Sequence, residues 1–206
     1  MRLIGMLDSP YVRRVAISLS FMDIPFSHEP LSVFRQFDDF ARINPVVKAP
    51  TLVTDDGVVL MDSTLILEHA ERLAPPERHL MPAAIRDQAR ARRVIGLALA
   101  ACEKTVQIVY ERNLRPPEKQ HQPWIDRVRG QLLAAYGLLE SEVASGRDWL
   151  FGVRPLQADI SVAVAWHFTQ SVLADVVSAE RHTGLKGFSE RAETLPQFQA
   201  WPFAGR

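Results

Sequence analysis

A serine followed by a proline stands where the first strand-like run of the sequence should give way to a helix. The run is Leu3-Ile4-Gly5-Met6, and Asp8-Ser9-Pro10-Tyr11 follows shortly after it. Serine is preferred just before a helix and proline at the first helical position, so Ser9 can act simply as a cap. A hydroxyl at that place can also help the helix N–H groups to hold an anion, such as a thiolate. Ser9 is therefore the first candidate for chemistry.

Two later segments could contribute to the same chemistry. The run Asn44-Pro45-Val46-Val47-Lys48-Ala49-Pro50 leads into a predicted strand, where a proline removes one donor from the sheet. A cis bond before Pro50 would turn the backbone of Ala49 outward, and an ordinary trans turn proline is the alternative. The pair Asp62-Ser63 begins a predicted helix, whose N–H groups could receive a ligand carboxylate or could only be capped.

The elements that must position these residues alternate between strand and helix in the first third of the chain. Strand patterns cover 3–6, 26–31, 51–54 and 58–61, and helix patterns begin near residues 10, 34 and 63. Asp55-Asp56-Gly57 predicts a tight hairpin between the last two strands. Pro75-Pro76 ends the last of these helices. The order βαβ followed by ββα predicts an α/β domain over 1–76.

After a linker at 77–82, the sequence pattern changes to long helical segments. Helices are predicted over about 83–113 and 122–144. Asp159 to Val177 is apolar on nearly every side, which indicates a helix enclosed by its neighbours. Glycines and prolines in the tail should limit the helices there to short pieces. Residues 83–206 are thus predicted to form an all-α C-terminal domain.

Composition excludes several classes of protein. Basic and acidic residues both number 24, so no overall field attracts nucleic acid or an anionic membrane. No run resembles a signal peptide or a membrane span, and we expect a cytoplasmic protein. The single cysteine, Cys102, excludes an internal disulfide and falls at an apolar helix position, which favours a buried filler. The histidines lack metal-ligand spacing, His69 fits an apolar helix face, and no metal is expected.

Taken together, three motifs resemble the signatures of the glutathione S-transferase N-terminal domain. They are Ser-Pro-Tyr-x-Arg-Arg-Val after the first strand, Asn-Pro-x-x-Lys-Ala-Pro before the third, and Asp-Ser after the fourth. The resemblance covers nearly the whole chain and implies a thioredoxin-like fold for 1–76, a cytosolic, bacterial-like enzyme with a serine-type site, and a homodimer. Two positions depart from the family pattern: Val47 replaces a common glycine, and Leu156 replaces the Ser or Thr of an N-capping box with Asp159.

By this resemblance, Ser9 is the catalytic residue and activates glutathione, the co-substrate, as its thiolate. In glutaredoxins a cysteine stands at this place, and Ser9 and Val12 replace the two cysteines of that motif, which argues against exchange through an enzyme thiol. Pro50 is expected to be a structural cis-proline. The expected contacts with glutathione are the backbone of Ala49 and the side chains of Lys48, Asp62 and Ser63.

The resemblance also implies a second substrate, a hydrophobic electrophile, in a pocket for which Tyr11 and Tyr110 are candidates. The expected activity is therefore that of a detoxifying glutathione transferase, which moves alkyl or aryl groups to glutathione. Three alternatives stay open: a glutathione-dependent isomerase of the maleylacetoacetate type, glutathionyl reductive chemistry, and a non-catalytic interaction module with the same fold.

Overall fold

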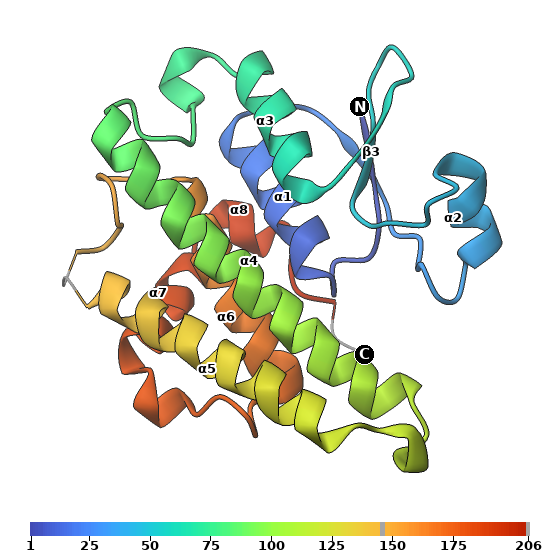
Figure 1. Ribbon diagram of the computed structural model, residues 1–206. Helices are drawn as coiled ribbons and strands as arrows, with labels where there is room; N and C mark the ends of the chain where they lie inside the picture. Colours follow the sequence, from blue (N-terminus) through green and yellow to red (C-terminus); the bar gives the residue numbers. More distant parts are fainter. Residues whose placement is uncertain (145–146, 205–206) are drawn as a thin grey trace. The chain divides into compact units, whose positions relative to one another are not determined.

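The computed structural model describes residues 1–144 and 147–204 (Figure 1). Its contacts divide the chain into two compact units, Met1–Leu80 together with Thr194–Arg206, and Met81–Glu193. The sequence pattern predicts one helical domain over 83–206, a range that includes residues 145, 146, 205 and 206 outside the described part. The segment from Thr194 instead belongs with the first unit, because its contacts are made there.

The first unit is built on a sheet with the strand order β2-β1-β3-β4. The strands are β1 (Arg2–Ile4), β2 (Ser27–Glu29), β3 (Thr51–Val53) and β4 (Val59–Met61). β1 pairs in parallel with β2 and antiparallel with β3, which in turn pairs antiparallel with β4. The predicted βαβ-ββα order is confirmed.

Helices and a short 3-10 turn complete this unit. They are α1 (Pro10–Phe21), α2 (Phe37–Ile43), α3 (Ser63–Leu73), the 3-10 turn Pro76–Arg78 and α8 (Pro196–Gln199). α1 packs beside α3 (Figure 1). Its apolar positions Val12, Val15 and Leu19 are fully buried. α2 is shorter than the predicted helix from residue 34, because the chain before it is held by the Ser32 hydroxyl, which accepts from the backbone of Phe34 and Arg35.

Among its described residues, the second unit has helices and 3-10 turns as its regular secondary structure. It contains α4 (Ile85–Leu114), α5 (Gln122–Val143), α6 (Gln157–Leu173) and α7 (Thr183–Glu193), with 3-10 turns at Pro117–Lys119 and Ala179–Arg181. α4 and α5 lie alongside one another, and α6 packs on both α4 and α7 (Figure 1). The predicted enclosure of α6 is confirmed, although the helix ends four residues before Val177. No described helix is long and apolar enough to cross a membrane.

α7 corrects the expectation that glycines keep the tail in short pieces. This helix runs for 11 residues although it contains Gly184 and Gly187. The carboxylate of Glu140 on α5 accepts the backbone N–H groups of Gly184 at 2.8 Å and of Leu185 at 2.9 Å. A carboxylate at a helix N-terminus satisfies orphan donors and opposes the helix dipole. The helix is therefore stabilised from another helix, which no local pattern records.

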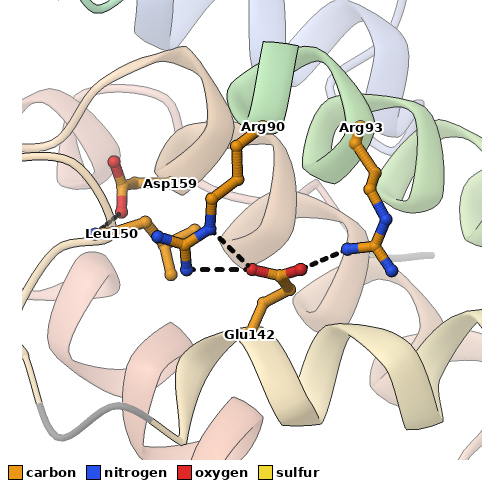
Figure 2. A network of polar contacts seen from close by, with 5 residues as sticks. All are labelled: Arg90, Arg93, Glu142, Leu150 and Asp159. Atoms are coloured by element: carbon orange, nitrogen blue, oxygen red, sulfur yellow. Dashed lines mark hydrogen bonds and ion pairs between the residues drawn. The ribbon is translucent and has the colours of Figure 1, made fainter. Parts of the chain in front are cut away.

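Polar contacts also tie α6 and α5 to their neighbours (Figure 2). Asp159 accepts from the backbone N–H groups of Leu150 and Leu156, both at 2.8 Å, so it caps α6 although Leu156 has no side-chain acceptor. Glu142 accepts from Arg90 at 2.9 Å and also pairs with Arg93, which joins α5 to α4. Asp159 thus anchors the start of α6.

Candidate functional site

Strand register brings three predicted segments to one end of the sheet. Ile4, at the end of β1, lies opposite Thr51, at the start of β3. Thr51 in turn lies opposite Met61, at the end of β4. The chain leaves β1 toward Ser9, enters β3 from the proline turn, and leaves β4 at Asp62. Because these three strand ends lie at the same end of the sheet, the three motifs become neighbours, although up to about fifty residues separate them along the chain.

Gly5 shows how closely two of these segments approach. Its φ is +136°, a conformation that side chains rarely adopt. A Cβ at this position would lie 2.7 Å from Val12 Cγ2 and 3.0 Å from the Cβ of Ala49. The first turn of α1 and the segment before β3 therefore close on Gly5 from two sides, and only glycine fits between them.

Ser9 is the N-cap of α1, and Pro10 is the first residue of the helix. Its Oγ accepts from the backbone N–H of Val12 at 3.4 Å, a long and weak bond. The side chain is half-buried, and among the described residues its hydroxyl hydrogen has no acceptor. The hydroxyl is consequently able to donate to a group that arrives at the helix N-terminus.

The segment before β3 is held by a buried amide. The Ala49–Pro50 peptide bond is cis. Asn44 is 3% exposed; its Nδ2 donates to Thr51 Oγ1 at 2.8 Å and its Oδ1 accepts from the N–H of Val46 at 3.1 Å. The Thr51 hydroxyl donates to the carbonyl of Lys48 at 2.8 Å. These bonds fix the backbone around Ala49, while the Lys48 side chain is exposed.

The third segment carries backbone strain. Asp62 has φ 69° and ψ 121°, a conformation rare outside glycine, and strained residues of this kind gather at functional sites. Its carboxylate accepts from the N–H of Thr64 at 2.8 Å. Ser63 is buried, and its Oγ accepts from Arg14 Nη1 at 2.9 Å. Since a guanidinium only donates, the Ser63 hydroxyl keeps its own hydrogen for another acceptor.

Sequence reasoning did not assign a role to Arg14. The residue is 2% exposed and joins α1 to the first residues of α3 through Ser63. The signal available was a charged residue within a run of apolar helix positions, because Arg14 lies between Val12 and Val15. Buried charges normally have specific partners, so such a position indicates a contact of some importance.

The remaining predicted residues are distributed over both units. Tyr11 is half-buried in the first turn of α1, and Tyr110 is 43% exposed on α4 of the second unit. Their role toward a second substrate stays a prediction. Cys102 is buried on α4 and His69 is half-buried on α3. Within 1–144 and 147–204, no group of three metal-binding side chains lies close enough to hold an ion.

Comparisons with known proteins agree with this arrangement. Models of the glutathione S-transferase N-terminal and C-terminal domains match residues 3–78 and 122–191. A GST-like protein of Escherichia coli, YibF, is 28% identical over 148 residues, which is 71% of each chain. Maleylacetoacetate isomerase of Pseudomonas aeruginosa is also 28% identical, over 159 residues and again 71% of each chain.

A solved structure extends the likeness to the entire chain. The glutathione S-transferase of Methylobacterium radiotolerans, in complex with glutathione sulfonate, is 27% identical. It covers 100% of this chain, 96% of its own length is matched, and the TM-score is 0.91. With matching domain models, a matching fold and the motifs gathered at one sheet edge, the chain belongs to the glutathione S-transferase family.

Proposed function

We propose that this protein is a glutathione transferase in which Ser9 donates a hydrogen bond to the sulfur of bound glutathione. The observation that carries the proposal is the position of Ser9. It caps α1, its hydroxyl hydrogen has no acceptor among the described residues, and the segment of Ala49 lies across Gly5 from the same helix turn. A family member similar to this chain binds glutathione sulfonate, a ligand with an anionic group in place of the thiol.

The other residues at this end of the sheet can bind the two ends of glutathione. The γ-glutamyl end carries an ammonium and a carboxylate. The Asp62 carboxylate can pair with the ammonium, while the Ser63 hydroxyl and the N-terminus of α3 can receive the carboxylate. Ala49 offers its backbone to the cysteinyl part, and the exposed ammonium of Lys48 can reach the glycyl carboxylate. Each contact pairs opposite charges or a donor with an acceptor.

The energy required for thiol activation is within reach of these groups. A thiol with a pKa of about 8.5 is only a few per cent ionised near neutral pH. Lowering the pKa by about two units requires roughly 2.7 kcal/mol of preferential stabilisation of the thiolate. A hydrogen bond to a charged group contributes roughly 1.5–3 kcal/mol and a helix N-terminus roughly 0.3–1 kcal/mol. The sum of roughly 1.8–4 kcal/mol spans this requirement, which supports a role for one serine at the start of α1.

The test is a pH titration of the ultraviolet thiolate absorbance of bound glutathione, with wild type and Ser9→Ala. We expect a lowered thiol pKa in wild type, a pKa near that of the unbound thiol in Ser9→Ala, and a fall in kcat of roughly a hundredfold, as for loss of one oxyanion donor. Ser141→Ala is the matched control, because that hydroxyl is exposed on α5 and donates only to the carbonyl of Gly137.

The outcomes separate the hypotheses. If Ser9→Ala keeps the lowered thiol pKa and the wild-type rate, Ser9 is not the activating residue. If the wild-type protein does not bind glutathione or does not lower its thiol pKa, the protein is a non-catalytic module with the fold of the family.

An isomerase is the second candidate, because one of the similar proteins is a maleylacetoacetate isomerase. In both reactions the thiolate adds to an electrophilic carbon. In conjugation the thioether is the product and the thiol is consumed. In isomerisation the adduct rotates about the former double bond, the thiolate leaves, and the thiol is recovered. Counting thiols after turnover with an activated aryl halide, and separately with a cis-unsaturated diketo acid, distinguishes the two.

A further inference from the structure

Gly5 is held by residues of β2 that have no role in the proposed chemistry. The His28 Nε2 lies 2.8 Å from the Gly5 carbonyl oxygen. Since a carbonyl only accepts, this nitrogen carries the hydrogen. The N–H of Gly5 donates to the carbonyl of Glu29 at 3.0 Å. Both backbone polar groups of Gly5 are therefore fixed by β2.

Trp201, from the C-terminal segment, fixes His28 in turn. Its indole ring meets the His28 ring edge-on, with centroids 5.8 Å apart, and stacks on Phe26 at 4.9 Å. Trp201 is itself held by α1: its Nε1 donates to Ser20 Oγ at 2.7 Å, and its carbonyl accepts from Arg13 Nε at 2.8 Å. A residue near the end of the chain thus joins β2 to the helix that carries Ser9.

We propose that His28 and Trp201 are positioning residues for glutathione, and this inference rests on the proposed function. Gly5 separates Val12, in the first turn of α1, from Ala49, with contacts as close as 2.7 Å to a hypothetical Cβ. A shift of Gly5 therefore changes its packing against both segments. His28 fixes the Gly5 carbonyl and Trp201 fixes the His28 ring. Together they set the separation between the Ser9 hydroxyl and the Ala49 backbone, the two groups that must contact the cysteinyl part at once.

The variants His28→Leu, His28→Gln and Trp201→Leu test this chain of contacts. Leucine cannot donate to the Gly5 carbonyl, whereas the glutamine amide nitrogen can take the place of His28 Nε2. For His28→Leu and Trp201→Leu we expect the Kd for glutathione to rise roughly tenfold and the bound thiol pKa to move toward that of the unbound thiol, since small misplacements of reacting groups have large effects. We expect His28→Gln to restore both values.

His79→Leu is the matched control. His79 also lies in the first unit, and its Nε2 is 3.1 Å from the carbonyl oxygen of Ala74, so its loss removes a similar bond. It should lower the melting temperature as His28→Leu does but leave the bound thiol pKa unchanged. That pKa is a property of the folded fraction, so a purely structural role for His28 would not move it.

The wild-type titration comes first and judges the proposed function alone. Given a lowered thiol pKa in wild type, unchanged Kd and thiol pKa in both His28→Leu and Trp201→Leu overturn the inference. A His28→Gln variant that behaves like His28→Leu also overturns it, because the bond to Gly5 is then not the cause. If His28→Leu does not fold, Trp201→Phe replaces it. That variant keeps an aromatic ring beside His28 but loses the hydrogen bond to Ser20. A bound thiol pKa equal to that of wild type in both Trp201 variants overturns the inference.

Discussion

In the second unit, Asp159 is fully buried and both of its carboxylate oxygens accept backbone N–H groups. In the first unit, Ser9 is half-buried and its hydroxyl hydrogen has no acceptor among the described residues. Both residues belong to the start of a helix. The difference is that Asp159 completes its hydrogen bonds within the protein, whereas the hydroxyl hydrogen of Ser9 is left open, and we propose that it serves a ligand. A helix start can thus serve stability or chemistry, depending on which groups it leaves open.

A second group of buried polar side chains in the helical unit is also paired within the protein. In the second unit, the buried Tyr136 hydroxyl donates to Thr169 Oγ1 at 2.6 Å, and Thr169 Oγ1 lies 2.7 Å from that of Thr105. Burial raises the pKa of Tyr136 well above its usual value, so this chain of hydroxyls stays neutral. Satisfied polar groups of this kind specify one packing of the helices.

Backbone strain, in contrast to the paired polar groups, is found in the first unit. The described residues with positive φ all lie in the first unit, and Gly5, Val47 and Asp62 flank the proposed glutathione site. Such conformations cost roughly 1–3 kcal/mol each in non-glycine residues and persist where function requires them. The first unit therefore carries the described residues with positive φ, whereas the second contains the paired groups of Asp159 and Tyr136 together with two buried glutamine oxygens, Oε1 of Gln107 and of Gln157, that have no partner among the described residues.

The strongest test compares the loss of the Asp159 side chain with the loss of the Ser9 hydroxyl. Asp159→Ala should lower the free energy of unfolding by about 2–4 kcal/mol, because it leaves the N–H groups of Leu150 and Leu156 without an acceptor. Its folded fraction should bind glutathione with the wild-type thiol pKa. Ser9→Ala should do the reverse, with a stability change below about 1 kcal/mol. Urea unfolding and the thiolate titration measure the two effects. A thiol pKa that rises in Asp159→Ala would break the distinction.

The pH dependence of stability gives the next largest effect. Burial raises the pKa of Asp159 from 3.8 to about 6, although its backbone hydrogen bonds oppose the shift. Between these values the folded protein binds a proton that the unfolded chain does not, so stability increases as the pH falls through 6 toward 4. The contribution is about 3 kcal/mol at full protonation and is lost as the pH rises through 6.

Asp159→Asn isolates this contribution because asparagine does not titrate. We expect the stability of wild type, relative to Asp159→Asn, to increase by about 2 kcal/mol between pH 7 and pH 4 in urea unfolding. A relative stability that is constant over this range would show that the Asp159 hydrogen bonds cancel the effect of its burial on the pKa. Ser9 does not titrate here, so Ser9→Ala should follow the wild-type curve.

Two glycines of α7 provide a smaller and local test. A Cβ on Gly184 would lie 2.7 Å from Glu140 Oε1, whereas a Cβ on Gly187 meets nothing within 4 Å. Gly184→Ala should therefore lower the free energy of unfolding by about 1–3 kcal/mol, as overpacking does. Gly187→Ala should raise it by up to about 1 kcal/mol through helix propensity. If both substitutions stabilise, Glu140 does not hold the start of α7.

Local chemistry explains which elements the sequence could predict. Asp55-Asp56-Gly57 marked the hairpin, Ser9-Pro10 marked the start of α1, and a proline pair marked the end of α3, since each acts on neighbouring backbone only. α7 and the C-terminal segment were not predicted correctly. Glu140 caps α7 from 44 residues away, and Arg13 meets Trp201 across 188 residues. Contacts at such separations leave no local pattern.

The candidate site shows the same limit. Ser9, Asp62 and Ser63 were predicted from motifs, and the strand register explains why these motifs lie at one end of the sheet. The cis bond before Pro50 was expected only from the resemblance, because residue types do not determine the isomer. Arg14 and His28 were not identified, since the Ser63 hydroxyl and the Gly5 carbonyl that they bind are defined only after folding.

Val47 gives the smallest test, at the position where the sequence departs from the family pattern. Its φ is +51°, which is unfavourable for a β-branched residue and natural for glycine. Relief of the left-handed conformation stabilises the folded protein by roughly 1–2 kcal/mol. The extra freedom of glycine in the unfolded chain destabilises it by roughly 0.5–1 kcal/mol. Val47→Gly should therefore stabilise the protein by about 0.5–1 kcal/mol in urea unfolding.

Val46→Gly is the control for this substitution. Val46 is 60% exposed and is not among the residues with positive φ, so glycine there brings only the entropic cost and should destabilise by roughly 0.5–1 kcal/mol. Opposite signs at two adjacent valines would show that strain at Val47 is real and separable from glutathione binding. If Val47→Gly instead weakens glutathione binding more than Val46→Gly does, the left-handed valine itself helps to shape the turn before Ala49, and the strain in this unit is tied to function.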